Sequence, residues 1–145
     1  MTIIDELYAL ADREDIPVYC FELPKARCLS YMDSEGNCSI GIDPMYIESY
    51  AEEAELLAHE LGHCMTGSFY NAQSPLDVRQ KHENHADLWM VSRLAPASRI
   101  SRLMKEGQCE SWQLAESLGV TQHVVEKALS LYAAKGMLYT QKCHP

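Results

Sequence analysis

The first hydrophobic positions of the chain recur with helical spacing. Within residues 2–12 the apolar side chains fall on one face of a helix: Ile3, Ile4, Leu7, Tyr8, Leu10 and Ala11. Thr2 precedes them and belongs to a residue type that often caps helix N-termini. The pattern therefore predicts a helix that begins after Thr2 and buries one face.

Three short runs with β-propensity follow this first helix. They are PVYCFEL (17–23), ARCLSYM (26–32) and NCSIGI (37–42). Pro24 separates the first two runs, and the turn-rich segment DSEGN (33–37) separates the last two. Because short turns join neighbouring antiparallel strands, the pattern predicts an antiparallel three-stranded meander.

Two longer helical patterns occupy the middle of the chain. The first spans about residues 49–65 and opens with a Ser-x-x-Glu capping box. The second spans about residues 74–94, opens with a serine–proline pair and must end before Pro96. Further short helices are predicted beyond residue 97, and three glycines are candidate helix ends: Gly107, Gly119 and Gly136.

Together these elements predict an α+β fold in two parts. In residues 1–96 a small antiparallel three-stranded sheet would pack on helices to form a core. Residues 97–145 would form a C-terminal helical segment packed on that core. With 145 residues, of which 47% are hydrophobic, the chain is long enough for one compact domain with a small appendage.

Composition and charge argue against two classes of partner. No apolar run approaches the roughly 20 residues that cross a bilayer, and the acidic, amphipathic N-terminus does not resemble a secretory signal. We therefore expect a cytoplasmic protein without a membrane partner. The net charge is −9, from 21 acidic and 12 basic residues, and no basic cluster is present. Such a chain repels phosphate backbones, so DNA is not an expected partner.

Six cysteines are spread along the chain without a Cys-x-x-Cys pair. The even number permits disulfides, but a cytoplasmic chain with its own hydrophobic core does not need them. We therefore expect reduced structural thiols. Cys64 directly follows His63, and adjacent helical residues diverge by about 100°. We expect a core thiol at this position rather than a metal ligand.

The segment LLAHELGHCM, residues 56–65, carries the strongest chemical signal. Residues four apart project from the same helical face, so His59 and His63 can bind one cation together. Glu60 is turned about 100° from His59. It can therefore flank the ion without binding it and accept a proton from water. The spacing predicts a zinc site, and an ordinary helix is the alternative interpretation.

A third ligand is available in KHENHADLW, residues 81–89. A catalytic zinc ion has three protein ligands and one open position. Glu83 lies 20 residues after His63, which leaves enough chain for an antiparallel helix to return. The alternative ligands are His82 and His85. His85 is two positions from Glu83 and faces away when Glu83 faces inward, whereas His82 is about 100° around the helix.

Asp87 lies one helical turn beyond Glu83 on the same face. A metal-bound histidine usually donates its other N–H to a carboxylate or a carbonyl. Asp87 suits this role, and His59 is the expected donor. A Glu-x-x-x-Asp motif after His-Glu-x-x-His resembles the thermolysin-like gluzincins.

A more specific resemblance covers two segments, HELGHCMTGSFYN (59–71) and KHENHADLWMVSRLAP (81–96). Together they resemble the ImmA/IrrE family of metallopeptidases, found in phages, integrative elements and their bacterial hosts. The second family motif has a glutamate, then Ala-Asp, an aromatic–small pair and Leu-x-Pro. The segment GNCSIGIDP (36–44) also resembles the strand before the zinc helix. The resemblance spans about residues 16–134; Met90 stands where the family commonly has alanine.

The resemblance implies a zincin-like core and a zinc-dependent endopeptidase. Members often cleave a repressor of the mobile element that encodes them, so a helix-turn-helix repressor is the expected partner. Carried over to this sequence, the ligands of Zn²⁺ are His59, His63 and Glu83, and the base is Glu60. Asp87 is expected to act through a ligand.

Hydrolysis also needs a donor for the negative charge that develops on the substrate carbonyl oxygen. The candidates are Tyr70, His82 and His85, which the sequence does not separate. For Tyr70, an aromatic ring packed in a surface loop is the simpler interpretation. The sequence therefore leaves three candidates for the residue that donates a hydrogen bond to the oxyanion.

The segment SWQLAESLGVTQHVVEKAL (111–129) is helix-turn-helix-like. Ala115, Gly119 and Val125 occupy its small, turn and apolar positions, and Thr121 would cap the second helix. It lacks arginines, so we expect a helix pair that packs on the core or contacts a protein. The alternative function for the whole chain is a regulatory protein-binding or DNA-binding module whose zinc site is structural.

Overall fold

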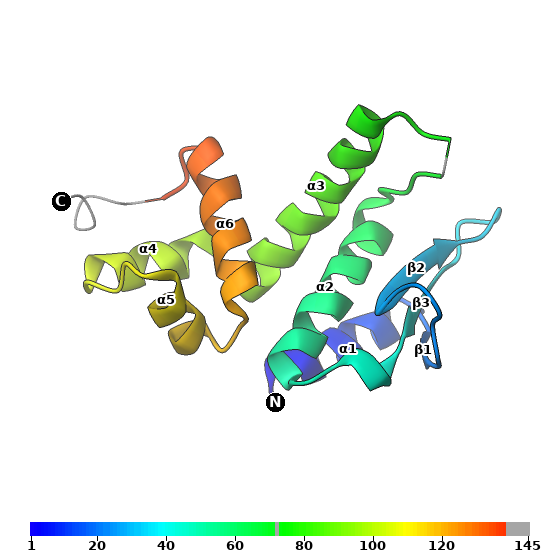
Figure 1. The fold of residues 1–145 in the computed structure, drawn as a ribbon, viewed down its shortest axis with the longest axis horizontal. Helices are drawn as coiled ribbons and strands as arrows, with labels where there is room; N and C mark the ends of the chain where they lie inside the picture. The colour runs from blue at the N-terminus through cyan, green and yellow to red at the C-terminus, as the bar shows by residue number, and fades with distance from the viewer. Residues whose placement is uncertain (72, 139–145) are drawn as a thin grey trace. The chain divides into compact units, whose positions relative to one another are not determined.

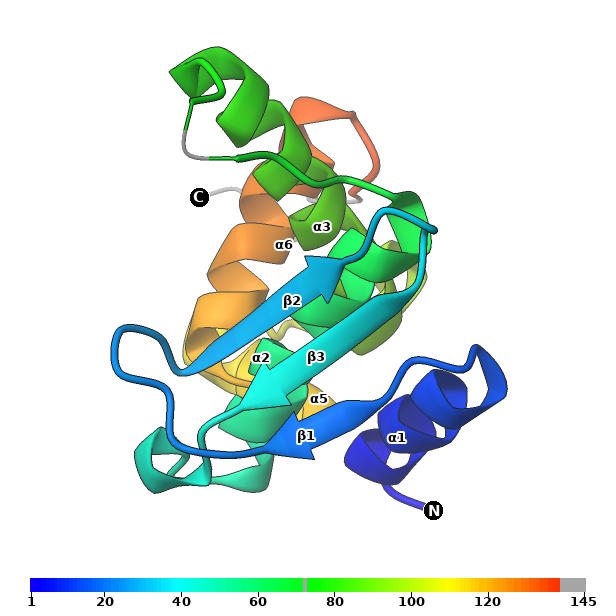
Figure 2. The same ribbon diagram turned by 90° about the vertical axis from the view of Figure 1, so that its right-hand side faces the viewer.

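The computed structural model describes residues 1–71 and 73–138 (Figures 1 and 2). This part of the chain is α+β, with six α-helices and one three-stranded sheet. The helices are α1 (Ile3–Arg13), α2 (Tyr50–Thr66), α3 (Leu76–Leu94), α4 (Ala97–Lys105), α5 (Ser111–Leu118) and α6 (Gln122–Ala134). The strands are β1 (Val18–Cys20), β2 (Cys28–Met32) and β3 (Cys38–Ile42), and the short 3-10 helix η1 is Pro44–Tyr46.

The chain divides into two compact units, Met1–Met90 and Val91–Pro145. The division falls inside α3, whereas the sequence places the boundary after residue 96. The first unit holds the sheet, α1, α2 and most of α3. The second holds the end of α3 and α4 to α6.

Two helix starts follow the local signals in the sequence. The Thr2 side chain caps α1 and forms a reciprocal capping box with Asp5. The Ser49 hydroxyl accepts the Glu52 N–H at the start of α2. Both predicted caps are confirmed. The Glu52 carboxylate does not complete the second box: its Oε1 binds Arg27 and its Oε2 accepts the Glu48 N–H.

The sheet is mixed, so the predicted antiparallel meander is wrong. β2 and β3 do form an antiparallel pair, joined by the turn at residues 33–37. β1 instead pairs with the other edge of β3, in the parallel direction, which gives the order β1-β3-β2. Figure 2 shows β3 between its two neighbours. The segment after β1 therefore crosses over to the far edge of the sheet before β2 begins.

A buried aspartate helps to hold this crossover. The Asp43 carboxylate is buried and accepts the backbone N–H groups of Leu23 and Met45. Hydrogen bonds to a buried carboxylate compensate for its loss of water. Leu23 is thereby fixed beside the end of β3, and the chain returns to the opposite edge.

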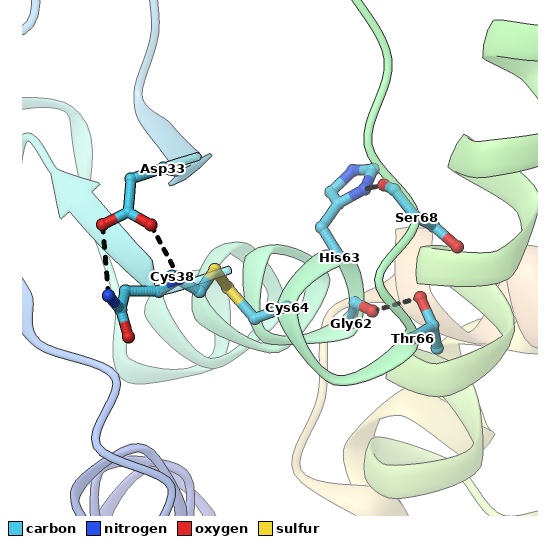
Figure 3. Close-up of a disulfide and its surroundings, with 8 residues drawn as sticks. Asp33, Cys38, Gly62, His63, Cys64, Thr66 and Ser68 are labelled. Carbon is cyan, nitrogen blue, oxygen red and sulfur yellow. Dashed lines mark hydrogen bonds between the residues drawn. A yellow bond between two sulfur atoms is a disulfide. The ribbon is translucent and has the colours of Figure 1, made fainter. Parts of the chain in front are cut away.

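Cys38 and Cys64 form a disulfide, so the expectation of reduced thiols at these positions is wrong (Figure 3). Cys38 points to the same sheet face as Ile40 and Ile42, which are buried. α2 packs against β2 and β3, which brings its residue Cys64 to Cys38. Cys109 is disulfide-bonded as well, whereas Cys20 and Cys28 are free thiols. The pairing of positions 26 residues apart depends on packing that spacing alone does not reveal.

The second unit has a hydrophobic core of its own. The Tyr132 hydroxyl is buried there and donates to the carbonyl oxygen of Ala95 at 2.9 Å. Thr121 caps α6 through the Val124 N–H, as predicted. The three predicted glycine stops all have positive φ just beyond α4, α5 and α6: Gly107, Gly119 and Gly136. Within the described ranges, none of the helices has the length and apolarity to cross a membrane.

Candidate metal centre

Three side chains from α2 and α3 converge in the first unit. His59 and His63 come from α2 and Glu83 from α3, and one ligand atom of each lies within 4.8 Å of the others. His59 contacts Asp87, and His63, one turn later on α2, contacts Glu83, one turn earlier on α3. α3 therefore returns antiparallel to α2, as the spacing predicts (Figure 1). This group is close enough to bind one metal ion.

The distances within this group suit a tetrahedral cation. The two Nε2 atoms of His59 and His63 are 3.2 Å apart. Glu83 places Oε2 at 3.0 Å from the first Nε2 and Oε1 at 3.2 Å from the second. Tetrahedral zinc with bonds of about 2.0–2.1 Å separates its ligand atoms by about 3.3 Å. The two nitrogens are near that distance from each other, and each Glu83 oxygen is near it from one nitrogen.

The outer nitrogen of each histidine is held by a group that can only accept. His59 Nδ1 donates to Asp87 Oδ1 at 2.8 Å. His63 Nδ1 donates to the Ser68 carbonyl oxygen at 2.5 Å, a contact that Figure 3 shows. A carboxylate and a carbonyl offer no proton, so both Nδ1 atoms carry hydrogen. Both Nε2 lone pairs are then available for a cation. Asp87 thus contacts the histidine that the sequence assigns to it.

Gly62 allows the two helices to approach closely. A Cβ atom at position 62 would lie 2.6 Å from the Ala86 carbonyl oxygen and 3.0 Å from its Cα. Real Cβ atoms do not make contacts that short, so α3 can lie this close to α2 because residue 62 is glycine. The sequence offers Gly62 as the second x of His-Glu-x-x-His, and nothing in that motif marks its role.

A pocket of about 190 Å³ opens beside this group. The sheet, α2, α3 and the chain after α2 contribute its lining: Cys28, Leu29, Ser30, Glu60, His63, Phe69, Tyr70 and Glu83. Glu60 therefore lines the same pocket as two of the three candidate ligands, without belonging to the ligand group. A carboxylate in this position can exchange a proton with a water molecule bound beside it.

The charges in the site perturb the protonation of all three residues. Burial lowers the pKa of His59, but hydrogen bonds to Asp87 and Glu83 outweigh it and raise this pKa to about 10. Burial also opposes protonation of His63, whose pKa is nevertheless raised by Glu83 and the Ser68 carbonyl. Hydrogen bonds from the two histidines hold the pKa of Glu83 far below its usual range. Without metal, protons therefore occupy the imidazoles that a cation would bind.

The three candidate oxyanion donors lie in different places. Tyr70 lines the pocket, and its hydroxyl donates to Glu83 Oε1 at 2.8 Å. His82 stacks on the Tyr70 ring, and His85 Nδ1 lies 3.0 Å from Ser68 Oγ. Neither histidine is among the residues that line the pocket. Of the three, the structure brings Tyr70 alone to the pocket.

Ser68, which contacts the ligand group, and Cys28, which lines the pocket, were not anticipated from the sequence. Ser68 is buried and holds His63 through its backbone carbonyl, a contact that depends on chain geometry and not on residue type. Cys28 brings a free thiol from β2, and burial and the charge of Glu60 both raise its pKa. Cys28 lies on β2, which is an edge strand in the observed order β1-β3-β2. The predicted meander places β2 in the middle of the sheet, so that prediction offered no reason to expect Cys28 at the pocket.

The site is thus two imidazoles and a carboxylate with compatible spacing, hydrogen-bonded outer nitrogens and a second carboxylate in the adjoining pocket. Comparison of the chain with family models, curated proteins and solved structures gave no match. Any functional assignment therefore depends on the geometry of this site and on the motif resemblance.

Proposed function

We propose that this chain is a zinc-dependent endopeptidase of the ImmA/IrrE type. The observation that carries the proposal is that Glu60 lines the same pocket as His63 and Glu83, two members of the His59–His63–Glu83 group. A metal site that only supports the fold has no need of a free carboxylate at this place. A hydrolase needs one as its base.

The residues present fit a zinc ion. His59, His63 and Glu83 would hold it, because nitrogen and oxygen donors at these spacings match its preferences. When bound, zinc lowers the pKa of water and polarises a substrate carbonyl. Their exposed side-chain fractions of 24%, 7% and 31% leave the group partly desolvated yet open to the pocket.

Glu60 would act as the general base and then as the acid. Its carboxylate would accept a proton from the attacking water and pass it to the departing amine nitrogen. Asp87 and the Ser68 carbonyl would keep hydrogen on the outer nitrogens of His59 and His63. The imidazoles would thereby keep their inward lone pairs throughout turnover.

The position of β2 supports a peptide substrate. β2 is an edge strand, and its residues Cys28, Leu29 and Ser30 line the pocket. The outer side of an edge strand presents a row of backbone N–H and C=O groups. An extended peptide can pair with such a row and lie across the pocket. Together with the motif resemblance, this favours a helix-turn-helix repressor of a phage or mobile element as the substrate, in a cytoplasmic setting.

The alternative is a regulatory module with a structural zinc ion. Structural zinc usually has four protein ligands. The described residues supply a group of three, and Cys64 is committed to its disulfide. The helix pair α5–α6 keeps the proposed role of packing or protein contact, and DNA is not the proposed partner. These observations favour the enzyme.

The test separates metal binding from turnover. Wild-type protein and Glu60→Gln are purified with zinc, and their zinc content is measured by atomic absorption. Each is incubated with a proteome-derived peptide library and with candidate helix-turn-helix repressors, and new chain ends are identified by mass spectrometry. We expect equal zinc content, but cleavage by the wild type alone.

Glu116→Gln is the matched control, since it makes the same change on an exposed face of α5. It should cleave like the wild type. Equal turnover by Glu60→Gln would contradict the assigned base. A zinc-loaded wild type that cleaves neither the library nor any repressor would contradict the peptidase itself.

A further inference from the structure

We infer that Tyr70 is a positioning residue for the third ligand, Glu83. The inference rests on the metal site of the proposed function, but it does not depend on what the protein cleaves. The Tyr70 hydroxyl donates to Glu83 Oε1 at 2.8 Å, while Oε2 of the same carboxylate faces His59. Glu83 Oε1 also lies 3.2 Å from His63 Nε2, so Tyr70 fixes how the carboxylate is turned between the two imidazoles.

The proton count of a phenol favours this role over oxyanion stabilisation. A tyrosine hydroxyl has one hydrogen to donate. Here that hydrogen is directed to Glu83 Oε1, an acceptor that carries negative charge. Charge-assisted bonds of this kind are stronger than bonds between neutral groups. A hydroxyl so engaged cannot donate at the same time to a substrate oxygen.

With Tyr70 included, each member of the ligand group has one hydrogen-bonding partner outside the group. His59 donates to Asp87, His63 donates to the Ser68 carbonyl, and Glu83 accepts from Tyr70. Such partners fix the orientation of a ligand before metal arrives and commonly change its affinity. A carboxylate needs this more than an imidazole does, because either of its oxygens can turn to the ion.

The chain that carries Tyr70 is itself held between α2 and α3. Gly67 ends α2 in a left-handed conformation, and the Ser68 N–H donates to the His63 carbonyl oxygen. Ser68 Oγ lies 3.0 Å from His85 Nδ1 on α3. The His82 ring stacks on the Tyr70 ring, with centroids 6.3 Å apart and planes inclined by 21°. The hydroxyl is thus aimed by contacts on both sides of its short segment.

The test measures zinc affinity and needs no substrate. Tyr70→Phe removes the hydroxyl but keeps the ring that stacks on His82. We expect its zinc dissociation constant, measured by competition with a chromophoric chelator, to rise by about 10- to 100-fold. Tyr50→Phe is the matched control, because Tyr50 is 80% exposed at the start of α2, and its affinity should be unchanged.

Two further readouts distinguish positioning from a general effect on folding. The visible absorption bands of the cobalt-loaded protein should change in Tyr70→Phe, while the far-ultraviolet circular dichroism of the metal-free protein should not. In a double-mutant cycle, Tyr70→Phe should weaken zinc binding in the wild-type background and have no further effect beside Glu83→Ala. A merely structural loss would persist in both backgrounds.

The outcomes separate this inference from the proposed activity. Equal zinc affinity and equal cobalt spectra for Tyr70→Phe and the wild type overturn the positioning role. A lower affinity that persists beside Glu83→Ala overturns it as well. A wild type that binds zinc without cleaving peptides refutes the peptidase only, whereas one that binds no zinc refutes both.

Discussion

Gly62 of α2 lies against the backbone of Ala86 of α3, and a Cβ atom at position 62 would come within 2.6 Å of the Ala86 carbonyl oxygen. His63 directly follows Gly62, and Asp87 directly follows Ala86. This close contact thus lies next to His63, a candidate ligand, and to Asp87, the partner of His59. A helix pair held further apart would not bring Glu83 to both imidazoles.

The first prediction concerns this contact. Gly62→Ala should lower the free energy of unfolding by about 1–3 kcal/mol through overpacking, and it should weaken zinc binding. The sign is diagnostic, because alanine in an unobstructed helix stabilises by about 1 kcal/mol relative to glycine. Chemical denaturation of the metal-free protein gives the free energy, and chelator competition gives the affinity. A stabilised variant would show that the close contact is absent.

The second prediction concerns the carboxylate behind His59. Asp87→Asn should weaken zinc binding by about 10- to 100-fold, because the amide is a poorer acceptor for the Nδ1–H than the carboxylate. Asp77→Asn is the control, since Asp77 is exposed in the first turn of α3. Isothermal titration calorimetry measures both. Equal zinc affinities for the two variants would contradict the role of Asp87 in holding His59.

The third prediction is a pH dependence of the metal-free protein. The folded pKa of His59 is about 10, above its ordinary 6.5, and that of His63 is also raised. The stability they contribute is fully present below about pH 6.5 and is lost as the pH rises toward 10. The pKa of Glu83 is lowered from 4.5, so its contribution is lost as the pH falls below that value.

Zinc should change this dependence. The ion replaces protons on the imidazoles, so zinc binding should release protons and tighten as the pH rises. Thermal unfolding midpoints test both statements. They are measured from about pH 4 to about pH 10, the range over which these groups titrate, once with a chelator and once with zinc. The metal-free midpoint should fall on the alkaline side, while the zinc-loaded midpoint should hold. Parallel curves would contradict the proposed competition.

The fourth prediction concerns the bond between Cys38 and Cys64. It joins positions 26 residues apart. In the loop-entropy model, closing a loop of that length raises the free energy of the unfolded chain by about 3.5 kcal/mol. A double variant, Cys38→Ser with Cys64→Ser, should lose about 2–4 kcal/mol of unfolding free energy. Denaturant titration of the oxidised proteins measures the loss. Cys20→Ser is the control, because Cys20 is a free, exposed thiol.

How far the sequence could predict each feature depends on how local its cause is. Thr2 and Ser49 cap their helices through contacts within three residues, and both were predictable. The grouping of His59 with His63 follows from helical spacing alone. β1 was misplaced because its choice between two edges of β3 depends on a crossover held by the buried Asp43.

The residues that complete the site depend on packing between separate segments. Ser68 contributes a backbone carbonyl, which any residue could supply, so its identity carries no signal. Gly62 matters because of what lies opposite it on α3. Tyr70 was among the candidates, but its partner could not be named before the chain after α2 was placed. The spacing of residues along one helix can be read from the sequence, whereas the residues that pack against that helix from other segments cannot.

The Cys38–Cys64 bond has a practical consequence for anyone who purifies this protein. Host cells with reducing or oxidising interiors would deliver two covalently different molecules from one coding sequence. The sulfur bridge fixes the helical turn beside His63 to the sheet, so the two molecules should differ in how firmly that turn is held. Intact-mass measurement without reductant should therefore precede any metal titration, because a blended preparation would report an average that belongs to neither molecule.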